Sequence, residues 1–406
     1  MSEKNSAPEL RFNDYFDEWD QNKLSDLFDF QNGFNGSRDR YGQGTKLISV
    51  MDILNNQYIT YENIRGMANV NDDEKRRYSV EYGDVLFQRS SENFEDAGRT
   101  NVYLGEKIAV FGGFVIRGKK KKEYDPFWVK YALDSSPVRK QITTKAQGVQ
   151  HINVSQDTLS DVDIMMPELD EQKIIGNYFH NIDDLIDIQQ QKLEKLYNMK
   201  KSCLQKMFPK HNAEMPEIRF EGFLTAWKNK PLSECFDERM ESMPEGELLS
   251  VTIGSGIKKF LELDRHDNSN SDKSKYKKVC VGDIAYNSMR MWQGASGFSP
   301  YEGIVSPAYT VVKPKDGIDS LFFAYMFKKK EMIHLFEINS QGLTSDTWNL
   351  KYPAFSKIVV RVPDDIKEQR KIAGFLQNLD EMIMYAEQEL ELTKRMKKGC
   401  LQKMFV

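Results

Sequence analysis

Several short segments combine residue types that could carry out chemistry. Asp125-Pro126-Phe127-Trp128 and Ser306-Pro307-Ala308-Tyr309 resemble the loop with which amino-methyltransferases hold the target amine. In that loop a second proline aims a backbone carbonyl at the amine, and neither segment has this proline. No glycine-rich cofactor loop follows a strand in the required arrangement. The sequence therefore predicts no methyltransferase centre, and a fused methyltransferase stays only as an alternative.

A nuclease is the second class of enzyme whose motifs the sequence partly matches. Glu171-Gln172-Lys173, together with Asp163 or Glu168, has the residue types of a metal-dependent nuclease motif, and Glu368-Gln369-Arg370 repeats part of it. Both segments lie where a helix is expected to begin, and the helix dipole favours acidic residues there. The sequence has no phosphate-binding G-x-x-x-x-G-K-[ST] motif, so no ATPase of that class is predicted. We interpret both segments as helix starts.

The nucleophiles and metal ligands are scattered. The four cysteines form no CxxC pair, the five histidines do not cluster, and no Ser/His/Asp or Cys/His arrangement stands out. We therefore expect no catalytic residue, no metal and no cofactor, with the thiols reduced. The N-terminus lacks a signal-peptide core and no apolar run is long enough to cross a membrane, so a cytoplasmic protein is expected.

Basic and aromatic residues gather in glycine-rich segments. GSRDRYGQG contains Arg38, Arg40 and Tyr41, and NSMRMWQGASG contains Arg290 and Trp292. Lysine runs lie at 119–122 and 273–278. Lys and Arg contact DNA phosphates, and Arg, Asn, Gln, Ser and Thr read base edges. The net charge of −4 counts against nucleic-acid binding in bulk, although it does not exclude local basic patches.

The elements that must position these loops are repeated. Residues 171–208 align without a gap to residues 368–405, and the segment that begins at Pro8 matches the segment that begins at Pro216. Between these matched ends the two copies diverge, apart from short echoes such as Gln147-Gly148 and Gln341-Gly342. Similar ends with dissimilar middles are expected for one scaffold that carries two different binding surfaces. The alternative is an old duplication whose middles diverged without a functional reason.

The matched C-terminal segments are predicted to be helices. They contain no proline and many strong helix formers. A heptad seam runs through each, with alternating steps of four and three residues. The seams are Ile182, Ile186, Gln189, Leu193, Leu196, Lys200, Cys203 and Met207 in the first copy and Leu379, Ile383, Ala386, Leu390, Thr393, Lys397, Cys400 and Met404 in the second. We expect the helices to pair as an intramolecular coiled coil, and the alternative is that each docks on its own domain.

The divergent middles mix short β-type runs with glycine turns and helices. Strands are predicted at 46–50, 84–87, 107–110 and 114–117, and a short helix at 127–133. In the second copy the predicted strands are 248–253, 283–286, 309–312 and 358–362, with one helix over 320–336. The fold class is therefore α/β, with two mixed α/β domains in tandem joined by two long helices. The expected domains are 1–166, 167–209 (helix), 210–362 and 363–406 (helix).

At this point the sequence resembles a known family. The two EQ…LQKMF segments are similar to the spacer regions of specificity subunits of type I restriction-modification systems. GDIAYNSMRMWQGASGFSPYEGIVSPAYTV, at 282–311, and the approach to the second helix, QGLTSDTWNL, are similar to their target-recognition domains. The resemblance covers essentially the whole chain.

The resemblance implies a DNA-sequence specificity subunit without catalysis of its own. Each middle would read one half of a bipartite double-stranded DNA site, and two antiparallel helices would set the gap. Two modification (methyltransferase) subunits would dock on the chain, and ATP-dependent restriction subunits would join them. A coiled-coil adaptor without DNA specificity is the remaining alternative.

Family logic places the base-reading residues in loops of each middle. The candidates in the first middle are Arg38, Arg40, Tyr41, Arg89, Lys145, Gln147 and His151. Those in the second are Lys258, Arg290, Trp292, Gln341, Thr344 and Ser345. The Gln147 and Gln341 loops are expected to be equivalent because each precedes the final strand and helix of its copy.

Overall fold

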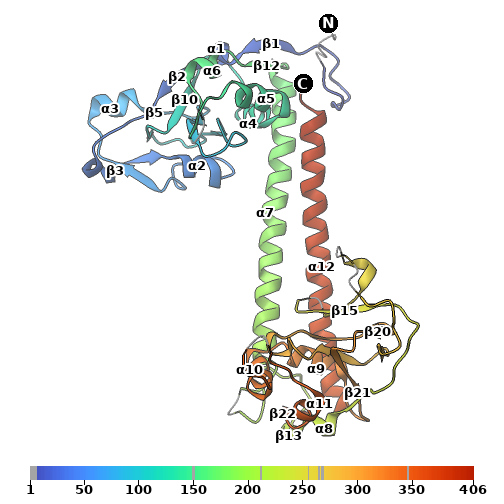
Figure 1. Ribbon diagram of the computed structural model, residues 1–406. Helices are drawn as coiled ribbons and strands as arrows, with labels where there is room; N and C mark the ends of the chain where they lie inside the picture. The colour runs from blue at the N-terminus through green and yellow to red at the C-terminus, as the bar shows by residue number, and fades with distance from the viewer. Residues whose placement is uncertain are drawn as a thin grey trace. The chain divides into compact units, whose positions relative to one another are not determined.

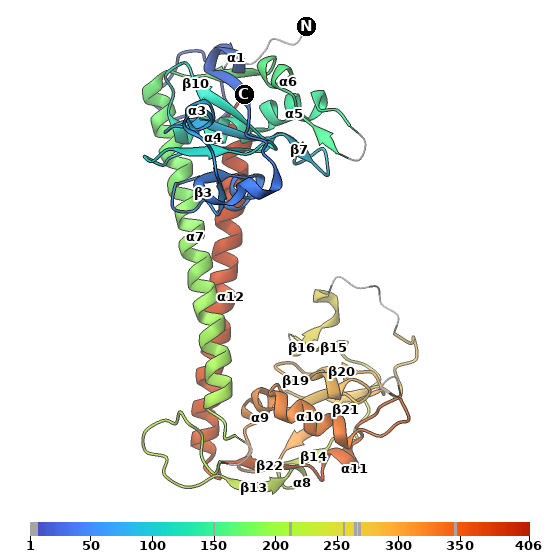
Figure 2. The same ribbon diagram turned by 90° about the vertical axis from the view of Figure 1, so that its left-hand side faces the viewer.

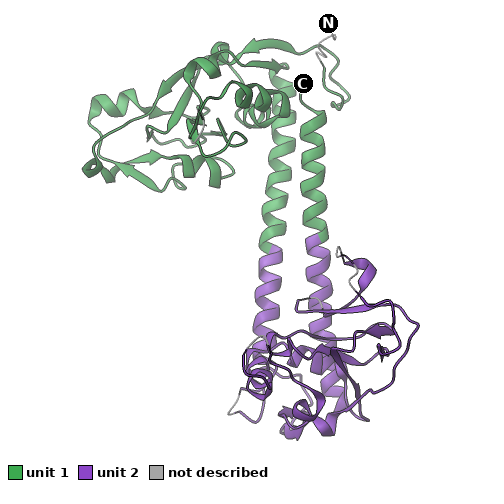
Figure 3. Ribbon diagram, viewed as in Figure 1, with its two compact units in different colours: residues 1–191, 388–406 green, residues 192–387 purple. Residues whose placement is uncertain are grey.

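The computed structural model describes residues 7–148, 151–210, 213–254, 256–263, 266, 269–344 and 347–406. The chain forms two compact units, unit 1 with residues 1–191 and 388–406 and unit 2 with residues 192–387 (Figure 3). Each unit contains an α/β body and one part of each of two long helices, α7 (Leu169–Lys206) and α12 (Ile366–Lys403).

The first α/β body contains two four-stranded sheets. The central sheet is antiparallel, with the order β2 (Phe28–Asn32), β10 (Val115–Lys120), β6 (Val85–Gln88) and β8 (Thr100–Val102). The other has the order β4 (Gly66–Ala68), β3 (Tyr41–Ile48), β9 (Ala109–Phe111) and β5 (Ser79–Val80), and its β3–β9 pair is parallel. Two-stranded ladders join β1 (Asp20–Lys23) to β12 (Asp163–Met166) and β7 (Ser90–Ser91) to β11 (Ile152–Asn153).

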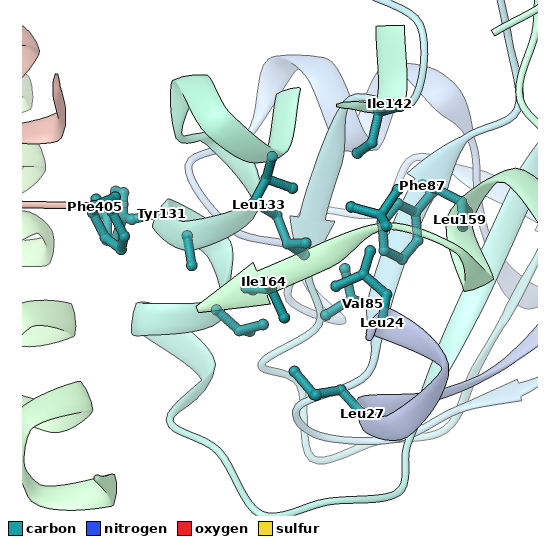
Figure 4. Packing of buried hydrophobic residues seen from close by; sticks show 14 of the residues in the cluster. Leu24, Leu27, Val85, Phe87, Tyr131, Leu133, Ile142, Leu159, Ile164 and Phe405 are labelled. Atoms are coloured by element: carbon teal, nitrogen blue, oxygen red, sulfur yellow. The ribbon is translucent and has the colours of Figure 1, made fainter. Parts of the chain in front are cut away.

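Short helices complete this body (Figure 1). They are α1 (Leu24–Leu27), α2 (Val50–Asn55), α3 (Asp72–Arg77), α4 (Pro126–Asp134), α5 (Ser136–Lys145), α6 (Gln156–Ser160) and the 3-10 turn η1 (Arg38–Arg40). Leu133 and Ile142 from the α4–α5 pair pack in one core with Phe87 of β6 and Ile164 of β12 (Figure 4).

The second α/β body repeats the central sheet, with the order β14 (Phe236–Glu238), β21 (Tyr309–Pro314), β18 (Ile284–Asn287) and β19 (Ser296–Phe298). The ladder of β13 (Lys228–Pro231) with β22 (Val359–Val362) corresponds to β1 with β12. Two further ladders pair β15 (Leu249–Thr252) with β16 (Gly256–Lys259) and β17 (Lys277–Val279) with β20 (Gly303–Val305). The helical elements are α8 (Leu232–Cys235), α9 (Ser320–Met326), α10 (Lys330–Asn339), α11 (Tyr352–Phe355), η2 (Phe260–Glu262) and η3 (Met291–Gln293).

The prediction of one helix over 320–336 was wrong. The structure has α9 and α10 with a break at residues 327–329 (Figure 2). Lys329 has extended backbone angles (φ −68°, ψ 144°), and the Lys328 side chain turns to backbone carbonyls of neighbouring loops. The backbone leaves the helical conformation at Lys329, and the segment has no proline or glycine that would signal this break. The other predicted strands and the 127–133 helix overlap observed elements to within a few residues.

The two long helices pair antiparallel inside each unit, which confirms the predicted coiled coil. In unit 2, Leu196 of α7 packs with Ile383 and Ala386 of α12. In unit 1, Ile182 of α7 shares a core with Met404 near the end of α12. The polar seam residues are paired as well, because Lys397 bonds with Asp183 in unit 1 and Lys200 with Asp380 in unit 2. These ion pairs explain how lysine occupies an apolar seam.

Each helix starts on the body of its own copy and ends on the other body. Phe405, after α12, packs against Trp19 in unit 1, with ring centroids 6.3 Å apart. Phe208, after α7, packs against Trp227 in unit 2 at 6.2 Å. The backbone N–H of Leu10 donates to the carbonyl of Lys403 in the first case. The repeated LQKMF sequence is therefore a docking end, and both alternatives for the helices hold in part. Among the described residues, no helix is apolar over a length that would cross a membrane.

Candidate nucleic-acid interface

The residues that looked like catalytic motifs belong to the part of each copy that the other copy repeats, which we call the frame. Arg11 donates to both carboxylate oxygens of Glu171 at 2.7 and 2.8 Å, and the Trp19 indole N–H donates to Glu171 at 3.2 Å. Glu171 is 1% exposed, so this carboxylate is held inside the protein by a bidentate arginine. Asp125 caps α4 by accepting from the Trp128 N–H at 2.8 Å. The helix dipole alone was thus an incomplete reason for Glu171, since its partner lies 160 residues away.

The second copy uses the same contacts. Arg219 donates to Glu368 at 2.7 and 2.8 Å, and Trp227 donates to Glu368 at 3.1 Å. Asp319 caps α9 through the Phe322 N–H at 2.9 Å. The frame residues are therefore engaged with one another in both copies.

Two loops occupy equivalent places, as the Gln-Gly echoes suggested. Gln147 and Asn153 close the first loop by exchanging backbone hydrogen bonds of 3.0 and 2.7 Å. Gln341 and Asn349 close the second with bonds of 3.0 and 2.8 Å. After each closing asparagine the chain bonds to the end of the central strand, Val154 to Arg89 and Leu350 to Ser288. The same scaffold therefore presents a shorter loop in the first copy and a longer one in the second.

In the first body the structure brings several candidates together. Arg89 and Gln147 line a polar hollow of about 420 Å³ with Asn32, Asn153 and Ser155. The side chains of Arg89 and Gln147 are exposed. Amide, hydroxyl and guanidinium groups thus converge on one hollow, and these are the groups that read base edges.

A second hollow of about 630 Å³ is lined in part by Ser90 and Ser91 of strand β7. Tyr41 and His151 both line it, together with Glu92 and Asp96. Carboxylates repel phosphates, but they accept hydrogen bonds from the amino group of cytosine. Most of the other side chains that line this hollow are apolar, among them Leu47, Met51 and Phe114.

In the second body Trp292 connects two candidate loops. Its ring meets that of Trp348, in the Gln341 loop, edge-on at a centroid distance of 5.3 Å. Its indole N–H donates to the Met289 carbonyl at 3.0 Å. Arg290 is exposed and lines a hollow of about 620 Å³ with Asn287 and residues of β15. The structure thus places Arg290, Trp292 and the Gln341 loop on one face.

Other candidates are held by intramolecular contacts. Arg40 bonds to Glu74 and to the Asn69 carbonyl, and its guanidinium lies 4.8 Å from the centre of the Phe34 ring. Lys145 bonds to Asp161 at 2.6 Å. Hydrogen bonds from Lys145 and Lys23 hold the pKa of Asp161 down at about 2, so this carboxylate stays charged at neutral pH.

The remaining candidates lie on the surface without joining these groups. Arg38 is exposed in η1, Lys258 is half-buried in β16, and Thr344 is exposed and bonds to Thr347. Ser345 lies outside the described residues. In the 119–122 lysine run each side chain has a polar partner: Glu81, Glu123, Asp29 and Asn22.

Sequence reasoning missed Asn32, Asn153 and Trp348. A signal for two of them was present, because Gln-Gly begins and Asn ends the corresponding loop in both copies. Trp348 follows as the aromatic residue just before the second of these asparagines. Among the described residues, no group of three or more His, Cys, Asp or Glu side chains has the arrangement of a metal site.

Comparison with known proteins shows the family to which this architecture belongs. The family model of the type I restriction modification DNA specificity domain matches residues 17–198 and again residues 226–394. The chain belongs to this family. Each match covers one α/β body and most of the long helix that follows it, so the specificity domain occurs twice in the chain.

One curated relative and two solved structures are distant in sequence but similar to the chain over more than nine tenths of their length. A putative type I restriction enzyme MjaX specificity subunit of Methanocaldococcus jannaschii is 20% identical, and the alignment covers 94% of this chain and 91% of that protein. The crystal structure of a type I restriction-modification system S subunit from M. genitalium has a TM-score of 0.58 at 15% identity and covers 98% of this chain and 99% of its own. A structure described with complex assembly and conformational transition of the type I system has a TM-score of 0.51 at 12% identity, covering 95% and 97%. The structural likenesses concern the fold.

Proposed function

We propose that this specificity subunit reads a bipartite double-stranded DNA site, with one half-site for each α/β body. The observation that carries the proposal is the pair of equivalent loops, 147–153 and 341–349, which differ in sequence and length on a matched frame. A frame that is kept while its loops change is what two different half-sites require. The base-reading groups we assign are Arg89, Gln147 and His151 in the first body and Arg290, Trp292 and Gln341 in the second.

We further propose that the chain acts in the cytoplasm without a catalytic centre of its own. Two modification subunits would dock on it and methylate adenines, and restriction subunits would join that complex. Phosphate binding would then come largely from the partners, which fits the net charge of −4. The residue types of the reading loops support base contacts rather than chemistry.

The helices would set the gap between the half-sites. A helix of 38 residues, the length of α7 and of α12, is about 57 Å long at 1.5 Å per residue. Inserting one heptad in register into both helices should widen the gap between half-sites. An unchanged gap in a folded complex would remove the helices as the ruler.

The deciding experiment maps DNA methylation in a host that expresses the chain with its modification subunit, and in a host that lacks only the chain. A bipartite motif that depends on the chain would support the proposal. Soluble, co-purifying proteins without chain-dependent methylation, and without selective DNA binding in a direct assay, would favour the adaptor alternative.

Domain exchange then tests the assignment of half-sites. Replacing residues 210–362 with the same region of a relative should change one half of the motif and leave the other. A change in both halves would contradict one half-site for each body.

A further inference from the structure

In each α/β body one loop connects two neighbouring strands of the central sheet. Residues 89–99 connect β6 to β8 in the first body, and residues 288–295 connect β18 to β19 in the second. We call these the strand-return loops. They carry Arg89 and Arg290, and near its end each has a glycine with positive φ, Gly98 (66°) and Gly294 (81°). The two loops are therefore equivalent although their sequences are unrelated.

A helix packs on each of these glycines. A Cβ atom on Gly98 would lie 2.6 Å from Cγ2 of Ile142 in α5, and one on Gly294 would lie 3.3 Å from Cδ1 of Ile333 in α10. Ile142 is fully buried in the core of the first body. The end of each loop is thus fixed between the sheet and the second helix of a helix pair.

A single cation completes each contact. Arg139 of α5 donates to the backbone carbonyls of Glu95, Ala97 and Gly98 at 2.7, 2.8 and 2.9 Å. In the second body Lys328 donates to the carbonyls of Gly294 and Ser296 at 2.8 Å and of Ile253 at 2.9 Å. An ammonium group has three N–H donors, so all three of Lys328 are used. Lys328 thereby ties the strand-return loop to the β15–β16 hairpin as well.

The two cations do not occupy matching sequence positions. Tyr131 bonds to Asp183 at 2.7 Å, and Tyr325 bonds to Asp380 at 2.7 Å, so these tyrosines are equivalent. Lys328 lies three residues after its tyrosine, whereas Arg139 lies eight residues after its own. The bodies thus reach the same contact from different positions, which indicates that the contact itself is needed.

We propose that Arg139 and Lys328 are positioning residues that fix the two strand-return loops, so that each controls base discrimination in its own half-site without touching DNA. The inference rests on the proposed function. A guanidinium that recognises guanine through two hydrogen bonds must be held in place, because a displaced donor loses the difference between right and wrong bases. Arg89 and Arg290 begin loops whose far ends these cations hold.

The test uses the reconstituted complex with its modification subunits and the motif found by methylation mapping. Binding is measured for the cognate DNA and for DNA with single base-pair changes in either half. Lys328→Met should lower discrimination about tenfold in the half read by the second body and leave the other half unchanged. Arg139→Met should do the reverse. Lys330→Met and Lys140→Met, at exposed positions of α10 and α5, are matched controls and should leave both halves unchanged.

Thermal unfolding shows whether each variant is folded. If a methionine variant does not fold, Lys328→Arg or Arg139→Lys replaces it, because these changes keep the charge and alter only the donor geometry. The expected loss of discrimination lies in the same half-site. A folded variant with full discrimination in both halves would overturn the inference, as would an equal loss in both. A wild-type complex without half-site preference would instead overturn the proposed function.

Discussion

The two α/β bodies use matching residues where each helix begins and non-matching residues for the contact that holds their strand-return loops. The arginine–glutamate pair at the helix start has distances of 2.7 and 2.8 Å in both copies. The strand-return loops, by contrast, are held by Arg139 in one body and by Lys328 in the other. The frame is therefore held by matching residues in both copies, whereas the loop contact is kept and the residue that makes it differs.

The equivalence of the two frames should have its largest measurable effect at the helix ends. Phe208→Ala and Phe405→Ala should each lower the free energy of unfolding by about 3–5 kcal/mol, because each removes a ring from a tight core. Chemical denaturation measures both. If the frame has one solution in both copies, the two losses should be similar, and a large loss for only one variant would break the equivalence.

The buried arginine–glutamate pairs should show the next largest effect. Glu171→Ala and Glu368→Ala each leave an arginine without its carboxylate, at a cost of about 3 kcal/mol. Equal losses in denaturation would support matched frames. Lys173→Ala, which removes an exposed side chain two residues later, serves as the control and should change stability little.

The loops should separate the two copies. Arg89→Ala and Arg290→Ala should each weaken binding of the complex to cognate DNA by about 1–3 kcal/mol, in one half-site only. Competition with DNA altered in one half measures the assignment. Arg76→Ala, at an exposed position of α3, is the control. Binding that is lost equally for both halves would contradict separate reading surfaces.

The smallest effect is a difference in pH dependence. Burial, with a contribution from Lys200, lowers the pKa of Lys328 to about 8, against an ordinary value of 10.5. Between these values the unfolded chain binds more protons at this site than the folded chain, so folding gains stability as pH rises. The free energy of unfolding of the wild type, relative to Lys328→Met, should therefore increase from pH 8 to pH 10. Relative to Arg139→Met it should stay flat, because arginine remains charged. A decrease for Lys328 would contradict this environment.

Much of the frame could be predicted from the sequence. The seam residues repeat every seven positions, and burial follows that period, so Leu196 and Ile383 could be placed without coordinates. The Gln-Gly sequences at 147–148 and 341–342 located the equivalent loops, because the same frame positions begin the loop in both copies. The break between α9 and α10 could not be predicted, because Lys329 takes extended backbone angles in a segment without proline or glycine.

The candidate site was predicted less well, for a related reason. Arg38 and Arg40 look alike in sequence, yet one is exposed and the other bonds to Glu74, 34 residues away. Lys145 likewise has Asp161 as its partner. Whether a basic residue is available to DNA depends on its tertiary neighbours, and residue type does not report them.

The crossing of the helix ends has a consequence for synthesis of the chain on the ribosome. The core that contains Trp19 includes Phe405, so the body that is made first is completed only after residue 405 has emerged. Until then Trp19 and Phe179 lack the Phe405 ring that packs on them. For the second body Phe208 is made before the body itself, and its core waits only for the residues of α12 up to Leu379. Translation therefore finishes the two bodies in the reverse of the order in which it begins them.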